Sequence, residues 1–324
     1  MKNFNAKIIN EIFKQTPDVK NQVNYLMDIL SISKETSYRR FKNKIPFSIN
    51  EVAVIAERFN LSVDRLLDLK SGTNFPFNKT LNIHRNPEEI YADFLRGDIE
   101  LMESLAASTE MKITATMNKI PFRFLPFQEL FKFEYCHYLY STGKISLMSA
   151  RFSDLEIPSL INELHNKTVS CFNSLKNLTC IVDSALYANI IKKIQYYHRL
   201  KFLSDEDIQI LQAELFELLG MYENLLRSGK NKAGFDHVFY YSFFNIESNI
   251  VYIEYDANTL LQIWVYPESP VIIKDNQMIS DIQRRWIDSK MRTSMLISKT
   301  ADIQQVEMLR EIYKQISDIG NYDF

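Results

Sequence analysis

The first seventy residues place hydrophobic side chains three and four positions apart, the period of helices that bury one face. One stripe consists of Phe4, Ile8, Ile9, Ile12 and Phe13. The next consists of Val23, Leu26, Met27, Leu30 and Ile32. The pattern predicts a helix at each stripe. Thr16 and Pro17 supply an N-cap and a first-turn proline for the second helix.

Ser33 follows the second stripe directly and has the hydroxyl group that often caps the start of a helix. The helix predicted from Lys34 to Lys44 holds one acid, Glu35, against five cationic residues: Lys34, Arg39, Arg40, Lys42 and Lys44. Such an excess of cations matches a surface that neutralises phosphates. A helix, a tight turn and a second, cationic helix form the plan of a helix-turn-helix that contacts the DNA major groove. A small helical bundle with a solvated basic face is the alternative.

Two further helices are expected before residue 70. The segment from Ser48 to Glu51 has the S-x-x-E spacing of a capping box, and it precedes an apolar face made of Val52, Ile55, Ala56 and Phe59. Ser62 is placed to cap a last helix whose Val63, Leu66 and Leu67 point inward. The N-terminal region is therefore predicted to be a five-helix domain.

Residues Val23 to Leu67 resemble the helix-turn-helix of Cro/C1-type repressors, close to the BetR-type variant, and the segment from Ser33 to Lys42 is similar to the recognition helix of TetR-type regulators. This resemblance implies DNA-contacting residues, namely Ser33, Lys34, Glu35, Thr36, Tyr38, Arg39, Arg40, Lys42 and Lys44. By position, Lys34, Glu35 and Arg39 would face base edges. Phosphates would be contacted by Thr36, Tyr38, Arg40 and Lys44. Two residues depart from the family pattern: Ser31 replaces a turn glycine, and Ser37 replaces a buried aliphatic residue, whose packing Tyr38 or Phe41 would take over.

Charge is distributed unevenly along the 324 residues. The chain has a net charge of -2, yet residues 1–70 hold 12 Lys/Arg and 8 Asp/Glu, and the remainder holds 26 and 32. A basic N-terminal region followed by an acidic remainder suits a protein that presents only its first part to nucleic acid. The length predicts two or three domains, and 46% hydrophobic residues are sufficient for real cores.

The sequence offers little catalytic or metal-binding chemistry. The three cysteines, Cys136, Cys171 and Cys180, lack C-x-x-C spacing and are interpreted as buried thiols. Neither the five histidines nor the seven glycines fall into a known zinc, nucleotide-binding or nucleophile motif. We therefore expect no enzyme activity, no cofactor and no metal. The absence of a signal peptide or long apolar run predicts a cytoplasmic protein that contacts no membrane.

The segment from residue 71 to 80 contains Gly72 and Pro76 and is the predicted linker. Residues 81–232 are expected to be a mainly helical body, with helices at residues 87–108, 158–175, 184–202 and 204–226 and one weak strand at 111–117. The passage from Ile120 to Tyr140 is strongly aromatic and predicts a helix whose stripe includes Phe127, Leu130, Phe131, Tyr135 and Tyr138. It is similar to a segment of Bacteroidetes regulators that carry such an N-terminal domain.

Residues 233–324 change character. Period-two alternation predicts strands at residues 238–246, 249–256 and 260–266, which would form a small antiparallel sheet with a hairpin at Ala257 and Asn258. Helices are expected at residues 275–291 and 300–319. The fold class is thus predicted to be α+β and mostly α.

These features predict a sequence-specific transcriptional regulator that binds double-stranded DNA as a homodimer. The body would dimerise, sense an unknown small-molecule or protein effector, or both. An interaction or toxin–antitoxin-type protein with an autoregulatory helix-turn-helix is the alternative, and an enzyme with an appended DNA-binding domain is a weaker third. A deep pocket with convergent polar groups would favour sensing, and a flat helical surface would favour an interaction role.

Overall fold

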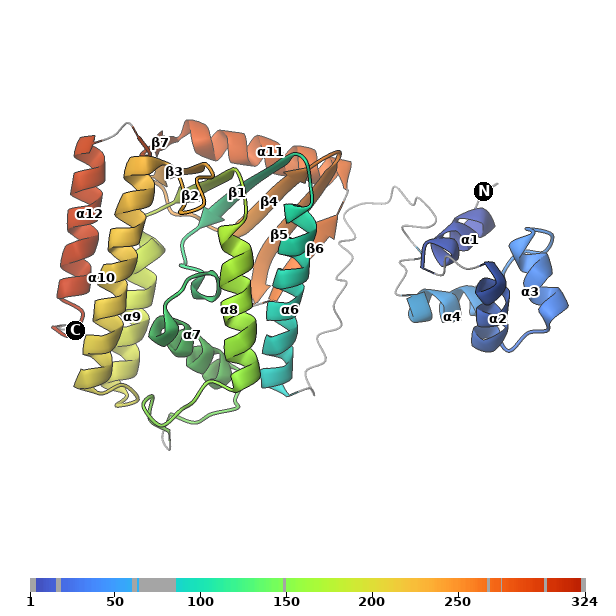
Figure 1. The fold of residues 1–324 in the computed structure, drawn as a ribbon, viewed down its shortest axis with the longest axis horizontal. Coiled ribbons are helices and arrows are strands. Elements are labelled where there is room, and N and C mark those ends of the chain that lie inside the picture. Colours follow the sequence, from blue (N-terminus) through green and yellow to red (C-terminus); the bar gives the residue numbers. More distant parts are fainter. Residues whose placement is uncertain are drawn as a thin grey trace. The chain divides into compact units, whose positions relative to one another are not determined.

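The computed structural model describes residues 4–15, 19–59, 63, 86–147, 150–266, 269–274, 276–299 and 302–321. Contacts divide the chain into two compact units, residues 1–80, here called the N-terminal unit, and residues 81–324, here called the body. The protein is α+β and mostly helical, as the sequence predicts (Figure 1).

The N-terminal unit contains four helices among its described residues: α1 (Phe4–Gln15), α2 (Val19–Leu30), α3 (Lys34–Phe41) and α4 (Ile49–Phe59). The fifth helix predicted after Ser62 lies outside the described residues apart from Val63, as do the predicted cap at Thr16 and the predicted linker. Buried residues of α1, α2 and α4 form one core: Ile8, Ile12, Leu26, Val52, Ile55 and Phe59. The rings of Tyr25 and Phe59 meet edge to face at 5.5 Å. Residues of the predicted apolar stripes therefore form the core of the N-terminal unit, as their helical spacing predicts.

Helix α3 is shorter than the predicted span to Lys44. Asn43 adopts a left-handed φ of 55°. The backbone N–H of Lys44 donates to the carbonyl of Arg39, and that of Asn43 to the carbonyl of Arg40, each at 2.9 Å. These two bonds are a Schellman motif, which satisfies the last carbonyls of a helix and usually places Gly or Asn at the left-handed position. Lys44 consequently follows the helix instead of lying on it.

The body combines a seven-stranded sheet with helices on both faces, counted over the described residues. Its helices are α6 (Pro87–Ala106), α7 (Gln128–Ser141), α8 (Ser159–Asn173), α9 (Ala185–Arg199), α10 (Asp205–Ser228), α11 (Gln277–Arg292) and α12 (Asp302–Ser317), with a 3-10 turn η1 (Phe122–Phe124). Its strands are β1 (Met111–Met117), β2 (Leu178–Val182), β3 (His237–Ser242), β4 (Ile250–Tyr255), β5 (Asn258–Tyr266), β6 (Ser269–Lys274) and β7 (Ser294–Leu296). The predicted helices are present, with ends that differ by a few residues.

The sheet has the order β6-β5-β4-β1-β2-β3-β7 and is mixed, which corrects the prediction of a small antiparallel sheet. Strand β1 pairs in parallel with β2, and β2 pairs in parallel with β3. The other pairings are antiparallel. Strands on both sides of residue 232 share this sheet, so 81–232 is not a separate helical region. Strand β2 falls inside a segment predicted to be mostly helical.

Alternating side chains of the strands feed two cores on opposite faces of the sheet. One face carries Ile113, Ala115, Cys180 and Phe239 and is covered by most of the helices, from α6 through α10 together with α12 (Figure 1). The opposite face carries Ile181, Tyr252, Leu261 and Ile273 and packs against Ile287 of α11. Antiparallel sheets often leave one face in water, whereas this sheet is buried on both sides, as parallel strands require.

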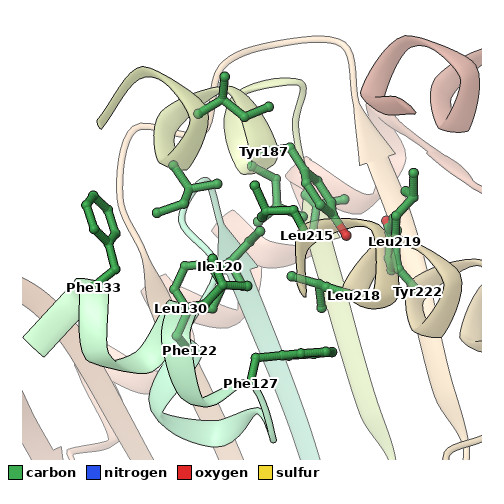
Figure 2. Close-up of a cluster of buried hydrophobic side chains, with 14 of the residues drawn as sticks. Ile120, Phe122, Phe127, Leu130, Phe133, Tyr187, Leu215, Leu218, Leu219 and Tyr222 are labelled. Atoms are coloured by element: carbon green, nitrogen blue, oxygen red, sulfur yellow. The ribbon is translucent and has the colours of Figure 1, made fainter. Parts of the chain in front are cut away.

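The predicted aromatic stripe lies inside the body. Residues Phe127, Leu130, Phe131, Tyr135 and Tyr138 are all buried. Figure 2 shows part of this core, where side chains of α7, α9 and α10 meet those of the segment after β1. Burial in the body's own core means that this stripe is not a spare surface for a partner. Cys136 and Cys180 are buried and Cys171 is half-buried, all as free thiols.

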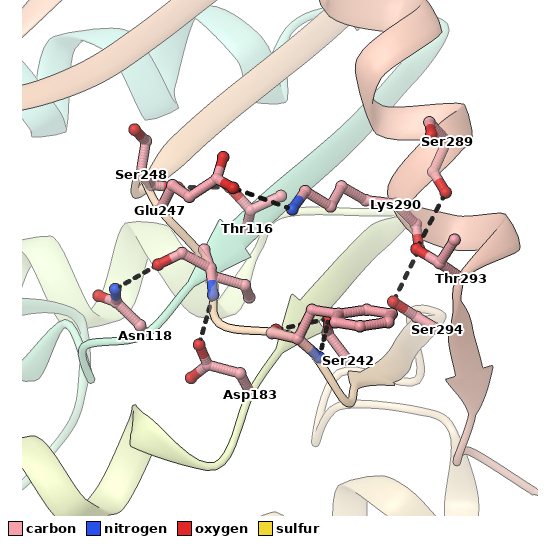
Figure 3. Close-up of polar contacts among 12 residues, drawn as sticks. Thr116, Asn118, Asp183, Ser242, Glu247, Ser248, Ser289, Lys290, Thr293 and Ser294 are labelled. Carbon is pink, nitrogen blue, oxygen red and sulfur yellow. Dashed lines mark hydrogen bonds and ion pairs between the residues drawn. The ribbon is translucent and has the colours of Figure 1, made fainter.

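A loop between β3 and β4 crosses the carboxyl ends of the parallel strands (Figure 3). The Thr116 hydroxyl donates to the Ser248 carbonyl at 2.9 Å, and the Asn118 backbone N–H donates to the Asn249 side chain at 2.9 Å. The buried carboxylate of Asp183 accepts the Ile246 backbone N–H at 2.6 Å. Open α/β sheets commonly bind ligands at these strand ends. Here the loop between β3 and β4 occupies that position. The cavity described below lies instead between the sheet and its helices.

Candidate nucleic-acid interface and body cavity

Helices α2 and α3 are joined by the three residues from Ser31 to Ser33. Ser31 has a φ of 51°, and the backbone N–H of Ile32 donates to the Met27 carbonyl at 3.3 Å. The Ser33 hydroxyl accepts the backbone N–H of Thr36 at 3.2 Å, which makes Ser33 the predicted N-cap of α3. Two helices joined by a tight turn of this length form a helix-turn-helix.

Helix α3 is held against α2 by a buried polar contact. Ser37 is fully buried, and its hydroxyl donates to the Val23 carbonyl at 3.0 Å. This bond explains how a serine fits where an aliphatic residue is common, because a buried hydroxyl costs little once it is hydrogen-bonded. Phe41 packs against the core of the unit, whereas Tyr38 is 54% exposed. Phe41 therefore provides the compensating packing, and Tyr38 does not.

The opposite side of α3 forms a continuous exposed face. Its members are Lys34, Glu35, Tyr38, Arg39 and Lys42, all of which are exposed. Their spacing of three, four and eight positions places them on one side of the helix. The Lys42 ammonium lies 5.5 Å from the centre of the Tyr38 ring. The face thus combines three cations with one acid and one aromatic ring.

Arg40 differs from the other cations of α3. Its side chain is mostly buried, and its Nη2 atom lies 2.8 Å from Glu51 Oε1. The guanidinium also lies 5.7 Å from the centre of the Phe47 ring. Glu51 belongs to α4, so this ion pair links α3 to α4. The structure gives Arg40 an internal contact in place of the exposed position that a phosphate-contacting residue occupies.

Glu51 closes the predicted capping box. It accepts the Ser48 backbone N–H at 2.5 Å, while the Ser48 hydroxyl accepts the Glu51 backbone N–H at 3.3 Å. Burial raises the pKa of Glu51, but the hydrogen bonds from Ser48 and the charge of Arg40 outweigh that effect and hold the pKa below its ordinary value. The carboxylate therefore stays ionised while it joins the helix start to α3.

The remaining predicted site residues lie at the two ends of α3. Thr36 is half-buried, and its hydroxyl lies 2.9 Å from that of Ser33. Lys44 is exposed at the last position of the Schellman motif. The structure thus gathers the nine predicted residues around one short helix and separates Arg40 from the exposed set.

The body contains a cavity of about 510 Å³ between the sheet and its helices. Its walls are mainly apolar and draw on β1, β2, β3 and α10, among other elements, with residues such as Ala115, Cys180, Phe239, Leu218 and Leu225. Protein interiors are close-packed, and unfilled apolar volume costs roughly 24 cal/mol per Å³. Small-molecule sites are typically mainly apolar clefts of about 300–1,000 Å³ with a few polar groups. The cavity has the dimensions and chemistry of a ligand site.

Charged side chains line part of this cavity. Glu134 of α7 is buried and lies between two ammonium groups, with Lys193 Nζ at 2.9 Å and Lys119 Nζ at 3.2 Å. A second pair joins Arg123 to Asp98 at 2.7 Å, and the Arg123 guanidinium lies 5.5 Å from the centre of the Trp264 ring. Among the described lining residues, three cations therefore face two carboxylates. The wall carries a net positive charge.

Two residues of the cavity wall each contain a polar atom that is closed to water-sized groups and has no hydrogen-bond partner among the described residues. These atoms are Nε2 of His237 and the hydroxyl oxygen of Tyr222. Burial lowers the pKa of His237, although a hydrogen bond to the Leu175 backbone and the charge of Asp236 act in the opposite direction. The ring is therefore neutral. Buried polar atoms without a partner are uncommon in native proteins.

Sequence reasoning did not find this cavity, because its lining residues come from elements spread from α6 to β5. One signal was present. Arg123 and Glu134 each interrupt an aromatic run, in Phe-Arg-Phe and Phe-Glu-Tyr. Charged residues are rarely buried unless they are paired, so a charge inside such a run indicates a buried ion pair or a site.

The two helices, the three-residue turn and the exposed cationic face define the N-terminal unit as a helix-turn-helix domain. Comparison with protein families agrees with this class. Residues 5–85 match the family model described as the BetR domain and constitute a regulator domain of the helix-turn-helix type. The match extends past Lys70 and ends before α6. Neither the curated proteins nor the solved structures contain a match to the chain.

Within the residues that the structure describes, no helix is both long and apolar enough to cross a bilayer. In the same part of the chain, no group of three or more His, Cys, Asp or Glu side chains is arranged to hold a metal ion.

Proposed function

We propose that this chain is a one-component transcription regulator whose N-terminal unit binds a specific duplex DNA site through α3. The observation that carries the proposal is the exposed face of α3, which presents Lys34, Glu35, Tyr38, Arg39 and Lys42 on a helix held firmly against α2. A recognition helix of this kind enters the major groove and contacts base edges. The BetR-domain match over residues 5–85 supports the same conclusion.

The contacts of α3 suggest a division of roles. Lys34, Glu35 and Arg39 are proposed to face base edges, and Tyr38 joins them because it lies between them on the exposed face. Lys42, at the carboxyl end of that face, and the flanking residues Lys44, Ser33 and Thr36 are proposed to contact phosphates. Arg40 is assigned to the internal link with Glu51. Phosphate contacts position a protein on DNA, and base contacts determine its specificity.

The test is selection of duplexes from a random pool by the full-length protein, followed by binding measurements over a range of salt concentrations. Arg39→Ala should relax base preference at defined positions and cost about 1–3 kcal/mol. Lys44→Ala should weaken binding about equally for all sequences and reduce the salt slope by about 1. Arg58→Ala, at an exposed position on α4, is the matched control. Failure to enrich any sequence, or equal sequence-independent losses for both variants, would contradict the proposal.

The body is proposed to sense a small molecule and to hold two copies of the chain together. The cavity supports sensing, since it combines an apolar interior with converging polar groups, whereas an interaction protein of the toxin–antitoxin kind needs only an outer surface. We infer a binding role without catalysis for this body. Turnover of any compound bound in the cavity would contradict that inference.

A further inference from the structure

We propose that the body cavity binds an uncharged, mainly apolar molecule with one terminal group that both donates and accepts a hydrogen bond, and that the amide of Gln262 pairs with this group. This inference names the ligand class of the sensing role proposed above, so its effect on DNA binding rests on that role. The binding itself rests on the cavity and on Gln262.

Gln262 is the polar residue of an otherwise apolar run in β5, Leu-Leu-Gln-Ile-Trp-Val. Because side chains alternate along a strand, Gln262 shares a face with Leu260 of the larger core and with Trp264 of the cavity wall. The Gln262 side chain is only 5% exposed. A buried amide normally has hydrogen-bond partners, since water is no longer available to it.

The amide of Gln262 has no hydrogen-bond partner among the described residues, yet it is not sealed inside the protein. The polar atoms that are both unpaired and inaccessible belong to other residues, such as His237 and Tyr222. Gln262 lines the cavity, so the accessible part of its amide opens into that space. An amide carries N–H donors and a carbonyl acceptor side by side. A ligand group with one donor and one acceptor therefore fits it.

The apolar part of the ligand is assigned from one row of side chains that crosses the sheet on the cavity side. Strand pairing places five lining residues in register: Gln262, Val251, Ala115, Cys180 and Phe239. Neighbouring strands lie about 4.8 Å apart, so the row is roughly 19 Å long from β5 to β3. Ala115 and Cys180 are small, and they leave space above the centre of the row that larger side chains would fill. This row suits an extended apolar chain that begins at Gln262.

The ligand is assigned as uncharged because of the surroundings of Gln262. Its register partners on β4 and β6 are both apolar. The guanidinium of Arg123 lies beside the Trp264 ring of the same strand, but its positive charge is already paired with Asp98. An ionised ligand group at Gln262 would lose its hydration without gaining a counter-charge of its own, which is costly. The other charged residues of the wall also have partners within the protein, so none of them is assigned to the ligand.

The experiment measures binding to the full-length protein by calorimetry with four probes that share one chain length: octanamide, N,N-dimethyloctanamide, octanoate and octylammonium. All are used below the concentration at which they aggregate. Octanamide should bind most tightly. It should exceed N,N-dimethyloctanamide, which has no N–H donor, by about three- to tenfold, the ratio expected from a neutral hydrogen bond. The two ions should bind most weakly.

Two variants identify the contacts. Gln262→Met, which keeps the length of the side chain, should remove the advantage of octanamide while N,N-dimethyloctanamide still binds. The same change at an exposed position of α10, Gln209→Met, should not. Ala115→Leu should weaken the binding of all four probes by filling the centre of the row, and Ala213→Leu, at another exposed position of α10, should not. Circular dichroism verifies that each variant is folded, and an unfolded variant is replaced by Gln262→Leu or Ala115→Val.

Equal binding of the two amides, or an octanamide advantage that is unchanged in Gln262→Met, would overturn the assignment of Gln262. Tighter binding of either ion than of octanamide would overturn the uncharged ligand. Unchanged binding in Ala115→Leu would overturn the position of the apolar chain along the row. If none of the probes binds while the protein still selects a duplex site, the ligand inference fails and the proposed regulator function stands. If the probes bind in the expected order but no duplex is selected, the DNA-binding function fails and this inference stands.

Discussion

At the scale of single residues, the turn of the helix-turn-helix places a serine in a backbone conformation that favours glycine. Ser31 adopts a φ of 51°, in the left-handed region where a side chain beyond glycine is disfavoured. We expect Ser31→Gly to stabilise the N-terminal unit by about 0.5–1 kcal/mol, because glycine adopts this conformation without strain. Urea unfolding followed by circular dichroism measures the change.

Asn43 provides the matched comparison for Ser31. It has nearly the same φ, 55°, at the end of α3. Asparagine tolerates the left-handed region better than serine, so Asn43→Gly should stabilise the unit less than Ser31→Gly does. A loss of stability in Ser31→Gly would show that a contact of the serine hydroxyl contributes more to the free energy of unfolding than the backbone strain costs.

A second residue, Glu51, makes the N-terminal unit sensitive to acid. Its pKa is lowered in the folded state, so its contribution to the free energy of unfolding is present above the ordinary value of 4.5 and is lost as the pH falls through the folded pKa. We expect the urea concentration at the midpoint of the N-terminal transition to decrease when the pH is lowered below about 4.5. This decrease should be smaller in Glu51→Gln. Glu57→Gln, at an exposed position of the same helix, is the control. Equal acid sensitivity in Glu51→Gln and the natural chain would remove Glu51 as the cause.

At the scale of elements, Arg39 and Arg40 are adjacent in sequence yet serve different contacts. Arg39 is exposed, and Arg40 joins α3 to α4 through Glu51. We expect Arg40→Gln to lower the unfolding midpoint of the N-terminal unit, since Glu51 loses its charged partner, while Arg39→Gln leaves the midpoint unchanged and weakens DNA binding. Stability and DNA affinity measured on both variants separate the two roles. The opposite pattern would show that Arg40 leaves Glu51 to contact DNA.

Local patterns predict elements well where side chains repeat with a clear period. The predicted helix caps at Ser33 and Ser48 are both present, because a cap depends on contacts within one helical turn. Strand β2 was missed since its five residues, Leu-Thr-Cys-Ile-Val, are buried on both faces and so lack alternation. The mixed sheet follows from pairings between strands far apart in the sequence, which no local pattern contains.

The same distinction applies to the sites. The nine predicted DNA-contacting residues lie around one helix, so their neighbourhood could be inferred from sequence spacing. The burial of Arg40 could not be inferred from the sequence, because its partner Glu51 lies on another helix. A count of charges does not reveal an ion pair between two helices. The cavity depends on contacts among distant elements and required the three-dimensional fold.

At the scale of the whole molecule, α7, α9 and α10 bury their apolar faces inside the body and leave little apolar surface for contact between two copies. Residues such as Phe131, Ile194 and Leu215 are fully buried. Among the described residues, α12 keeps large apolar side chains exposed, including Ile303, Val306 and Tyr313. Their spacing of three and seven positions places them on one side of α12. This side of α12 is the candidate contact between two copies.

We expect the full-length protein to be a homodimer joined through its bodies. One helix-turn-helix covers few base pairs, so specificity normally comes from two copies on half-sites about 34–36 Å apart, related by a two-fold axis. Light scattering should give a dimer both for the full chain and for a fragment of residues 81–324, the second compact unit. Val306→Asp should shift the fragment towards monomer, because a two-fold contact buries the new charge twice, whereas Gln304→Asp at an exposed polar position of α12 should not. A monomeric fragment beside a dimeric full chain would place the contact in the N-terminal unit, and a full chain that stays monomeric on DNA would contradict the dimer.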